Sequence, residues 1–483
     1  MLEYLYNSLV SFRKVFSRHR TWLIFTVIVL GFIGCSEMMG VTSFCRFWLL
    51  DTAGYHKLLG FFRSTAWNLP HLLKHWFVFV MSQNQALFSQ GRVVVIGDHT
   101  YISKEGRRMP GVVTLRQDSE TQSKPSYFRG QCWGAIAVVI GSALNPFALP
   151  LMLKMHQGFA HIESKKESNA LTLPEHMVKM ALDFALKIGN PVVFTLDAYF
   201  AVKTVFQMAQ SIYSIQLKAP LVEIIVKAKK GYVAYFQAAP EDYTGMGRPH
   251  KYGEEIHIME VFDHLHLFQK STIRIYGKLE QVPWLCLDLL WGSTGSLIRF
   301  VFAVTSRGPI VLMCSNLNQD PLAAIELNCL RTRIETMFDM LKNVLHCFQY
   351  HFWSKKMPKH SRRPKSNKTL QTPKYEDLQT VQACWNAIEG FVNCGAIALG
   401  MLQLIALQFP NQIWNRFEGF LRTRSREIPS ERTTKTVIAH LLLRDFCKVA
   451  SSATMREIQA NILSRDVQKK SIRLDRDLIK EAG

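Results

Sequence analysis

The sequence lacks the cysteine patterns that mark two common classes of small-domain protein. Its ten cysteines are scattered between Cys35 and Cys447, with no C-x-x-C pair and no Cys/His cluster at zinc-finger spacing. A disulfide framework or a structural zinc site needs such groupings. The pattern therefore favours free thiols in a reducing cytoplasm.

Uninterrupted apolar runs long enough to span a bilayer are also missing. The run Trp22–Cys35 follows several basic residues, but its 14 residues fall short of the roughly 20 that a membrane helix needs. No A-x-A cleavage pattern follows it. Residues 390–409 have the length but contain Asn393, Gln403 and Gln408. We interpret both segments as buried helices and expect no membrane contact, with a membrane-anchored or lipid-modified protein as the alternative.

Acidic residues are the scarcer charge. The chain has 58 Lys and Arg against 37 Asp and Glu, which gives a net charge of +21. A chain this basic is attracted to a polyanion, either nucleic acid or an anionic membrane surface. Its 48% hydrophobic and 20% charged content is typical of a globular protein. The length of 483 residues predicts two to four domains.

The predicted elements divide the chain into four parts. Residues 1–88 show helical periodicity and predict a helical N-terminal domain, which either binds DNA or only packs against the rest. Residues 89–353 alternate strands and helices, as an α/β domain does. Within them, residues 221–314 predict a mostly antiparallel β insertion. Residues 354–376 form a basic, proline-containing linker, and residues 377–483 predict a helical C-terminal domain.

Two strands of the predicted α/β domain end in an aspartate. Residues 92–98 are a β-branched run that ends at Asp98, and residues 191–196 lead directly to Asp197. If these strands are parallel neighbours, their carboxyl ends bring the two carboxylates together. Like charges repel, and a divalent cation relieves that repulsion. Oxygen ligands favour Mg²⁺ or Mn²⁺, and two such ions about 3.5–4 Å apart activate a water or a 3′-hydroxyl for attack on a phosphodiester.

A third acid lies on a long helix that we predict over residues 321–352. Arg331, Glu335 and Lys342 share one face of this helix, because they are spaced by four and seven residues. A cation on each side of a metal-binding glutamate suits a phosphate backbone that approaches the metal. The alternative is an ordinary Arg–Glu pair on a solvated helix, which the helix face taken alone favours.

Three segments together resemble the transposases of IS4-type bacterial insertion sequences. Arg331, Glu335 and Lys342 match the R-x3-E-x6-K part of the signature Y-x2-R-x3-E-x6-K. Residues 97–111 are similar to the D-D-T-x-x-x-K-x-G-x-x-M-P-G segment at the first catalytic acid of related transposases. Residues 196–200 are similar to the strand end that carries the second acid.

The resemblance covers about residues 89–353 and implies an α/β, RNase H-like catalytic core. It makes Asp98, Asp197 and Glu335 the catalytic acids that hold two Mg²⁺ ions, with Mn²⁺ as a substitute. Such a transposase binds the terminal inverted repeats in double-stranded DNA and cuts them by hydrolysis. It then joins the freed 3′-hydroxyl to target DNA without a covalent protein–DNA intermediate. The resemblance also implies a cytoplasmic, nucleoid-associated bacterial enzyme that forms a homodimer on paired ends through its C-terminal helices.

The resemblance further implies DNA contacts. Arg331 and Lys342 take the DNA-contact roles of the family. Trp291, in the β insertion, is the candidate to stack on a base flipped out during hairpin formation, and the alternative is a core tryptophan. The turn after the first strand carries three candidates for phosphate contacts, or only a solvated hairpin: Lys104, Arg107 and Arg108.

The sequence departs from the family pattern at two positions. Asn328 stands where the signature has tyrosine, and Gly97 stands where many relatives have a second aspartate. His99, beside Asp98, is expected to be a packed or hydrogen-bonded histidine and not a metal ligand. Two other functions remain open: a catalytically decayed or domesticated DNA-binding protein, and another RNase H-like nuclease in repair or RNA processing.

Overall fold

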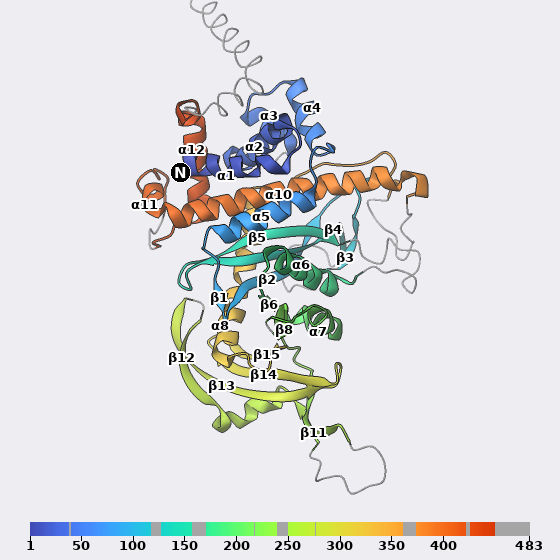
Figure 1. The fold of residues 1–483 in the computed structure, drawn as a ribbon, viewed down its shortest axis with the longest axis vertical. Helices are drawn as coiled ribbons and strands as arrows, with labels where there is room; N and C mark the ends of the chain where they lie inside the picture. Colours follow the sequence, from blue (N-terminus) through green and yellow to red (C-terminus); the bar gives the residue numbers. More distant parts are fainter. Residues whose placement is uncertain are drawn as a thin grey trace, which may run out of the picture.

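The computed structural model shows a mixed α/β protein with helical N- and C-terminal segments around a large mixed sheet of 13 strands. It describes the chain except for residues 38–39, 117–126, 157–170, 217, 239–249, 276, 361–372, 422–425 and 450–483, and no side chain from 443 onward. Figure 1 shows an elongated molecule, with the N-terminal helices at one end and the last strands of the sheet at the other.

Five strands form the centre of the sheet, in the order β5-β4-β2-β6-β9. Their bounds are β2 (Arg92–Ser103), β4 (Tyr127–Gly141), β5 (Pro146–His156), β6 (Val192–Leu196) and β9 (Val222–Lys227). β4 pairs antiparallel with both β2 and β5, whereas β6 pairs in parallel with both β2 and β9. The two strands that lead to the predicted catalytic aspartates are therefore parallel neighbours.

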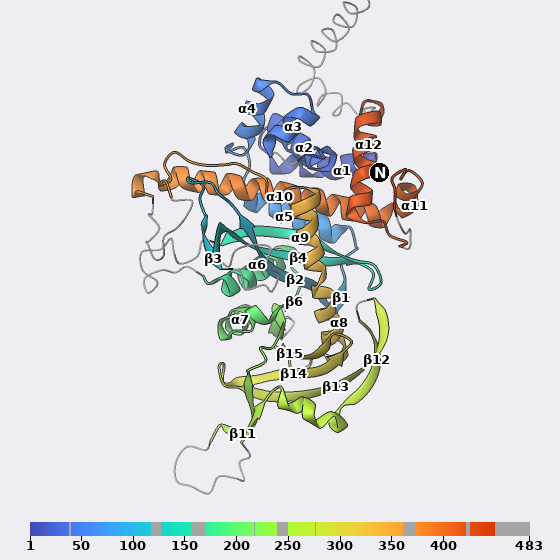
Figure 2. The same cartoon turned by 180° about the vertical axis from the view of Figure 1, so that it is seen from behind.

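Helices cover both faces of these central strands. α6 (Leu173–Ile188) and α7 (Lys203–Ala209) lie on one face in Figure 1, and α8 (Pro321–Arg331) and α9 (Arg333–Asp339) lie on the other in Figure 2. α6 begins at a capping box, in which Thr172 and Glu175 satisfy each other's backbone N–H groups.

The remaining strands extend the sheet beyond β9. They are β10 (Val233–Gln237), β11 (Tyr252–His257), β12 (Gln269–Ile275), β13 (Lys278–Trp291), β14 (Ser296–Thr305) and β15 (Gly308–Cys314). All of them pair antiparallel, and β15 joins them to β9. The sequence pattern groups β9 with this insertion, but its parallel pairing with β6 places it in the central set. Shorter strands are β1 (Phe88–Ser89), β3 (Val113–Arg116), β7 (Tyr213–Ser214) and β8 (Ala219–Pro220).

The two terminal helical segments pack against each other and share one continuous hydrophobic core with the sheet. The N-terminal helices are α1 (Leu2–Ser11), α2 (His19–Gly34), α3 (Val41–Phe47), α4 (Thr52–Phe61) and α5 (Leu69–Ser82). The C-terminal helices are α10 (Leu378–Gln408), α11 (Pro410–Trp414) and α12 (Glu431–Val449). α10 runs between α1–α4 and β5, as both cartoon views show, whereas α5 lies on the β5 side of α10 and contacts β5 itself.

The apolar helix α10 covers the open edge of the sheet. The Asn393 side chain accepts from the backbone N–H of Leu153 (3.0 Å) and donates to its carbonyl (2.8 Å). Glu389 accepts from the N–H of Met155 (2.9 Å). By length and composition the helical stretch Tyr375–Gln408 is able to cross a membrane, but 94% of its apolar window is buried inside the protein. The expectation of a buried helix is confirmed, and its polar residues satisfy the edge of β5.

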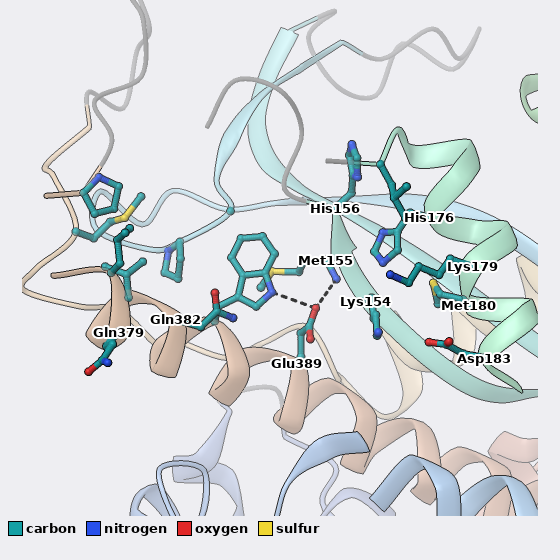
Figure 3. Close-up of a pocket in the computed structure, with 18 residues that line it drawn as sticks. Lys154, Met155, His156, His176, Lys179, Met180, Asp183, Gln379, Gln382 and Glu389 are labelled. Carbon is teal, nitrogen blue, oxygen red and sulfur yellow. Dashed lines mark hydrogen bonds between the residues drawn. The ribbon is translucent and has the colours of Figure 1, made fainter. Parts of the chain in front are cut away.

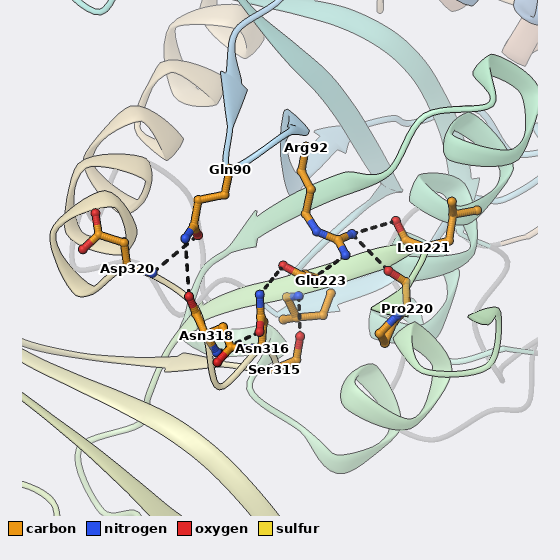
Figure 4. A network of polar contacts seen from close by, with 10 residues as sticks. Gln90, Arg92, Pro220, Leu221, Glu223, Ser315, Asn316, Asn318 and Asp320 are labelled. Atoms are coloured by element: carbon orange, nitrogen blue, oxygen red, sulfur yellow. Dashed lines mark hydrogen bonds and ion pairs between the residues drawn. The ribbon is translucent and has the colours of Figure 1, made fainter. Parts of the chain in front are cut away.

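A buried ion pair fastens the start of β2 to β9. The Arg92 guanidinium contacts the Glu223 carboxylate and donates to the carbonyls of Pro220 (3.0 Å) and Leu221 (3.3 Å), as Figure 4 shows. Asn316 donates to the other oxygen of Glu223 (3.1 Å). This network fixes the ends of the central strands that lie opposite the predicted aspartates.

Candidate active site

Asp98 and Asp197 lie at the same level on neighbouring strands. In the parallel pairing of β2 with β6, Ile96 stands opposite Thr195, and each aspartate lies two residues farther along. The prediction that Asp98 ends its strand is wrong, because β2 continues to Ser103 through its pairing with β4. Only the parallel partner β6 ends at this level.

Local backbone donors orient both aspartates. The N–H of His99 donates to Asp98 Oδ1 (2.7 Å), and the N–H of Tyr199 donates to Asp197 Oδ1 (2.8 Å). Asp197 thereby caps a short 3-10 helix, Ala198–Phe200. The two carboxylates are held in place by the chain that immediately follows them.

The structure brings Glu335 to the same place from a segment far along the chain. Glu335 lies in the first turn of α9. Burial raises the pKa of Asp98 from 3.8 to about 7; the negative charge of Asp197 adds to this rise, and that of Glu335 adds a smaller part. The three acids that the sequence singled out are therefore close enough to interact electrostatically.

Arg331 lies between two of these acids. Its Nη1 is 3.2 Å from Asp98 Oδ2 and its Nη2 is 3.7 Å from Glu335 Oε1. This positive charge lowers the pKa of Asp98, against the larger effect of burial. The Asp98 side chain is only 14% exposed, whereas that of Glu335 is 66% exposed. We call Asp98, Asp197 and Glu335 the acid cluster. The Arg331–Glu335 pair is thus part of this cluster and not an isolated pair on a solvated helix.

The acid cluster has some of the features of a divalent-cation site, but not a complete set of ligands. Among the described residues, no group of three or more His, Cys, Asp or Glu side chains is arranged to hold a metal ion. The raised pKa of Asp98 next to Asp197 nevertheless marks two carboxylates whose repulsion a divalent cation relieves. Both offer only oxygen, which suits Mg²⁺ or Mn²⁺. Glu335 lies 3.7 Å from the Arg331 guanidinium and is mostly exposed.

Lys342 also contacts β2 close to Asp98. Its ammonium donates to the Thr100 hydroxyl, and Thr100 lies two residues after Asp98 on the same face of β2. The predicted single helix over 321–352 is wrong, because α8 ends at Arg331, α9 begins at Arg333, and Met340–Val344 is a π-helical turn. The break does not separate Arg331, Glu335 and Lys342, which all face β2.

The other predicted DNA contacts lie elsewhere. Lys104 is buried, and its ammonium donates to the carbonyls of Phe348 and Tyr350 and lies 3.9 Å from the centre of the Tyr350 ring. Trp291 is 3% exposed and packs against Phe206 and Tyr232. Neither side chain is accessible to DNA in this structure, and both have structural contacts that explain them.

The turn that follows β2 contacts the chain after the π-helical turn. Arg107 Nε donates to the carbonyl of His360 (3.0 Å), and an Arg108 guanidinium nitrogen donates to the carbonyl of Lys355. The solvated hairpin that sequence allowed is instead tied to the first residues of the predicted basic linker. Residues 361–372 of that linker lie outside the described part of the chain.

His99 is packed among aromatic rings, as expected. Its ring lies 5.1 Å from that of Tyr101, 5.0 Å from Tyr199 and 5.8 Å from Phe200, measured between centroids. Burial lowers the pKa of His99, and the negative charge of Asp197 opposes this effect. Tyr199 was not expected as a neighbour of His99, although its position two residues after Asp197 was a usable signal.

Gly97 and Asn328, which depart from the family signature, both lie in closely packed parts of the structure. A Cβ atom at Gly97 would overlap the ring of Phe194, a fully buried residue of β6. An aspartate therefore has no room at this position unless Phe194 moves. Asn328 is 7% exposed on α8.

One cavity of the described structure is separate from the acid cluster. It has a volume of about 730 Å³ and lies between α6, β5 and α10. Figure 3 shows His156, His176 and Lys179 on one side and Gln382 and Glu389 on the other. The Glu389 carboxylate accepts from both Met155 N–H and the Trp385 indole (3.1 Å), so it is occupied by structural contacts. The cavity contains none of the three predicted catalytic acids.

Comparisons with known proteins do not assign the chain to a family. No protein-family model matches the chain. No curated protein is significantly similar to it. The resemblance to IS4-type transposases therefore rests on the sequence motifs alone.

Proposed function

We propose that this chain is a DNA transposase that cuts and joins the ends of an insertion sequence by two-metal-ion chemistry. The convergence of Asp98, Asp197 and Glu335 carries the proposal. These residues are far apart in sequence, yet the charges of Asp197 and Glu335 both raise the pKa of Asp98. Phosphodiester hydrolysis and strand transfer with Mg²⁺ need such a set of oxygen ligands.

The architecture supports an RNase H-like core in this proposal. The acids project from the middle of β2, from the end of its parallel neighbour β6, and from a helix packed on the same strands. The antiparallel extension from β10 to β15 lies between the second and third acids in sequence, as in the family that the motifs resemble.

Arg331 and Lys342 are the DNA-contact residues of the proposal. Both reach the acid cluster from α8 and the π-helical turn. Arg331 neutralises Asp98 and Glu335 in the protein alone, so binding of metal and DNA has to redirect its guanidinium to a phosphate. We propose this exchange as the step that completes the site.

The partners in this proposal are double-stranded DNA and a second copy of the chain, in the cytoplasm of a bacterium. The net charge of +21 supports a polyanionic substrate. The apolar composition of α10 does not call for a second copy, because α10 is buried against β5 and α2 within one chain. Dimerisation on paired ends therefore rests on the family resemblance alone.

Cleavage of a supercoiled plasmid that carries the DNA flanking the gene tests the proposal. With Mg²⁺, the wild-type protein should cut at discrete ends. Glu335→Gln should lower the cleavage rate by more than about a hundredfold, because the loss of a metal ligand removes several kcal/mol of transition-state stabilisation. Mn²⁺ should replace Mg²⁺.

Asp339→Asn is the matched control, since Asp339 is an exposed acid on the same helix and accepts only from Asn343 (2.6 Å). It should cleave at the wild-type rate. Binding of the flanking DNA without any cleavage by the wild-type protein would contradict the proposal and favour a decayed or domesticated DNA-binding protein. Cleavage without dependence on the flanking ends would favour another RNase H-like nuclease.

A further inference from the structure

Four arginines from separate segments line a pair of adjoining cavities. The cavities lie beside α9, on a different side of this helix from the acid cluster. Arg274 is the penultimate residue of β12, Arg307 lies between β14 and β15, Arg333 begins α9, and Arg426 precedes α12. The cavities measure about 320 and 230 Å³ and share Arg333 and Arg426. We call these four residues and the space between them the arginine pocket.

The positive charge of the arginine pocket is only partly balanced. Within the described ranges, the guanidinium groups of Arg274, Arg333 and Arg426 have no hydrogen bond or ion pair. Two glutamates line the same cavities. Glu326 accepts from the backbone N–H of Arg274 (3.4 Å), and Glu431 is buried and accepts from Gln403 (3.0 Å).

The electrostatics of Arg333 show that this arrangement is costly for the protein alone. Burial lowers the pKa of Arg333, and the neighbouring charge of Arg426 lowers it further, against an opposing effect of Glu431. Like charges held together without enough counter-charge destabilise the fold. An anion in the pocket removes that cost.

The chemistry of the pocket suits a phosphate. A guanidinium presents a planar fork of N–H donors that matches phosphate oxygens in pairs, and it stays charged at all physiological pH values. Several forks that converge on one cavity recognise a group with several oxygens.

The pocket is also placed beside the acid cluster. Arg333 and Thr336 line it from α9, the helix that carries Glu335. Arg333 and Thr336 lie on one side of that helix, whereas Arg331 and Glu335 face Asp98. A polyanion that passes around α9 meets both the acid cluster and the arginine pocket.

We propose that the arginine pocket binds backbone phosphates of the DNA strand that continues from the acid cluster around α9. This assignment rests on the proposed function for the source of the phosphate. The pocket positions the strand and takes no part in bond cleavage.

The test measures binding of a fluorescently labelled duplex of the flanking DNA over a range of salt concentrations, without divalent metal. Each phosphate contact contributes about 0.9 to the slope of log affinity against log salt. Arg274→Gln, Arg333→Gln and Arg426→Gln should each reduce the slope by about 1. The triple variant should bind at least tenfold more weakly at low salt.

Arg299→Gln is the matched control. The Arg299 guanidinium is already neutralised by Asp288, with Nε–Oδ1 at 2.8 Å and Nη2–Oδ2 at 2.9 Å. It should keep the wild-type slope. Thermal unfolding of the same variants reports on a purely structural role: Arg333→Gln should leave the midpoint unchanged or raise it, because it removes repulsion with Arg426.

Three results would overturn the assignment. The first is a wild-type slope and affinity for DNA in the triple variant. The second is a lowered unfolding midpoint in Arg333→Gln together with unchanged DNA binding, which makes the arginine structural. The third is stabilisation by inorganic phosphate that the triple variant loses while its DNA slope stays wild-type, which assigns the pocket to free phosphate. Because no step needs metal, these results are independent of whether the flanking plasmid is cleaved.

Discussion

At the scale of single residues, Asp98 combines two effects that usually act apart. Burial and the neighbouring Asp197 both favour the protonated carboxyl, and together they raise its pKa from 3.8 to about 7 despite the contact with Arg331. A carboxyl with this pKa changes charge near neutral pH. Binding of a divalent cation favours its ionised form and so competes with the proton.

The raised pKa of Asp98 predicts a pH-dependent stability. The folded protein binds a proton at Asp98 that the unfolded chain, at the ordinary value of 3.8, releases. The stabilisation that comes from the protonated Asp98 carboxyl is therefore fully present below about pH 4 and is lost as the pH rises to about 7. We expect Asp98→Asn to be more stable than the metal-free wild type above pH 7, with the advantage shrinking as the pH falls.

Urea unfolding of both proteins across this pH range measures the difference. Comparison with the variant cancels other titrating groups, such as Glu389 and Glu431, whose pKa values burial also raises. A difference in unfolding free energy that stays constant with pH would show that Asp98 does not titrate in this window.

The site residues differ in how far the sequence could predict them. Asp98, Asp197 and Glu335 were singled out by the family motifs that they match together, although Asp98 lies inside its strand and not at its end as expected. The burial of Lys104 was not predictable, since it depends on carbonyls of Phe348 and Tyr350 that lie far away in sequence.

At the scale of elements, α10 supplies hydrogen-bond partners to the backbone of the edge strand β5, as a neighbouring strand would. An edge strand exposes unpaired backbone N–H and C=O groups. Side chains of α10 bond to these groups at Leu153, Met155 and Ala148, the last through Gln403 (3.1 Å). Polar residues in an otherwise apolar helix are explained by this role.

Asn393→Leu should therefore destabilise the protein strongly. The change leaves the N–H and the carbonyl of Leu153 buried without partners, at a cost of about 1–3 kcal/mol for each group. Asn386→Leu is the control on the same helix, because Asn386 is exposed and only accepts from Gln382 (2.9 Å). Equal unfolding midpoints for the two variants in a thermal melt would rule out this role of α10.

The elements also show where sequence patterns fail. β2 and β6 are buried on both faces and were visible as β-branched runs. β5 escaped notice because Pro146 and Pro150 interrupt its pattern, which an edge strand tolerates. The break after Arg331 has no glycine or proline to announce it. It falls at Thr332, whose hydroxyl donates to the carbonyl of Cys329 (2.9 Å), a local bond that bends helices.

At the scale of the whole molecule, the helices of residues 1–82 and the helices of residues 378–449 pack together on the sheet. Lys435 in α12 donates to the carbonyl of Ile33 (2.9 Å) at the end of α2. Trp76 in α5 donates to the carbonyl of Pro150 (2.9 Å) in β5. The β-branched run from Arg92 correctly marked the start of β2, but it gave no sign that the helices before it complete the core of the rest.

Removal of residues 1–82 should consequently abolish folding of the remainder. The truncation exposes the apolar faces of α10 and β5 that the N-terminal helices cover, and apolar surface costs about 25 cal/mol for each Å² exposed to water. Thermal unfolding of the full chain followed by circular dichroism should show one transition, and the truncated chain should show none. An N-terminal segment that only adds DNA binding would instead leave a truncated protein with its own sharp transition. That outcome would separate the helices of residues 1–82 from the core as an independent domain. The expected outcome makes them a structural part of the sheet's covering layer, so that any DNA contact they make is coupled to the stability of the acid cluster.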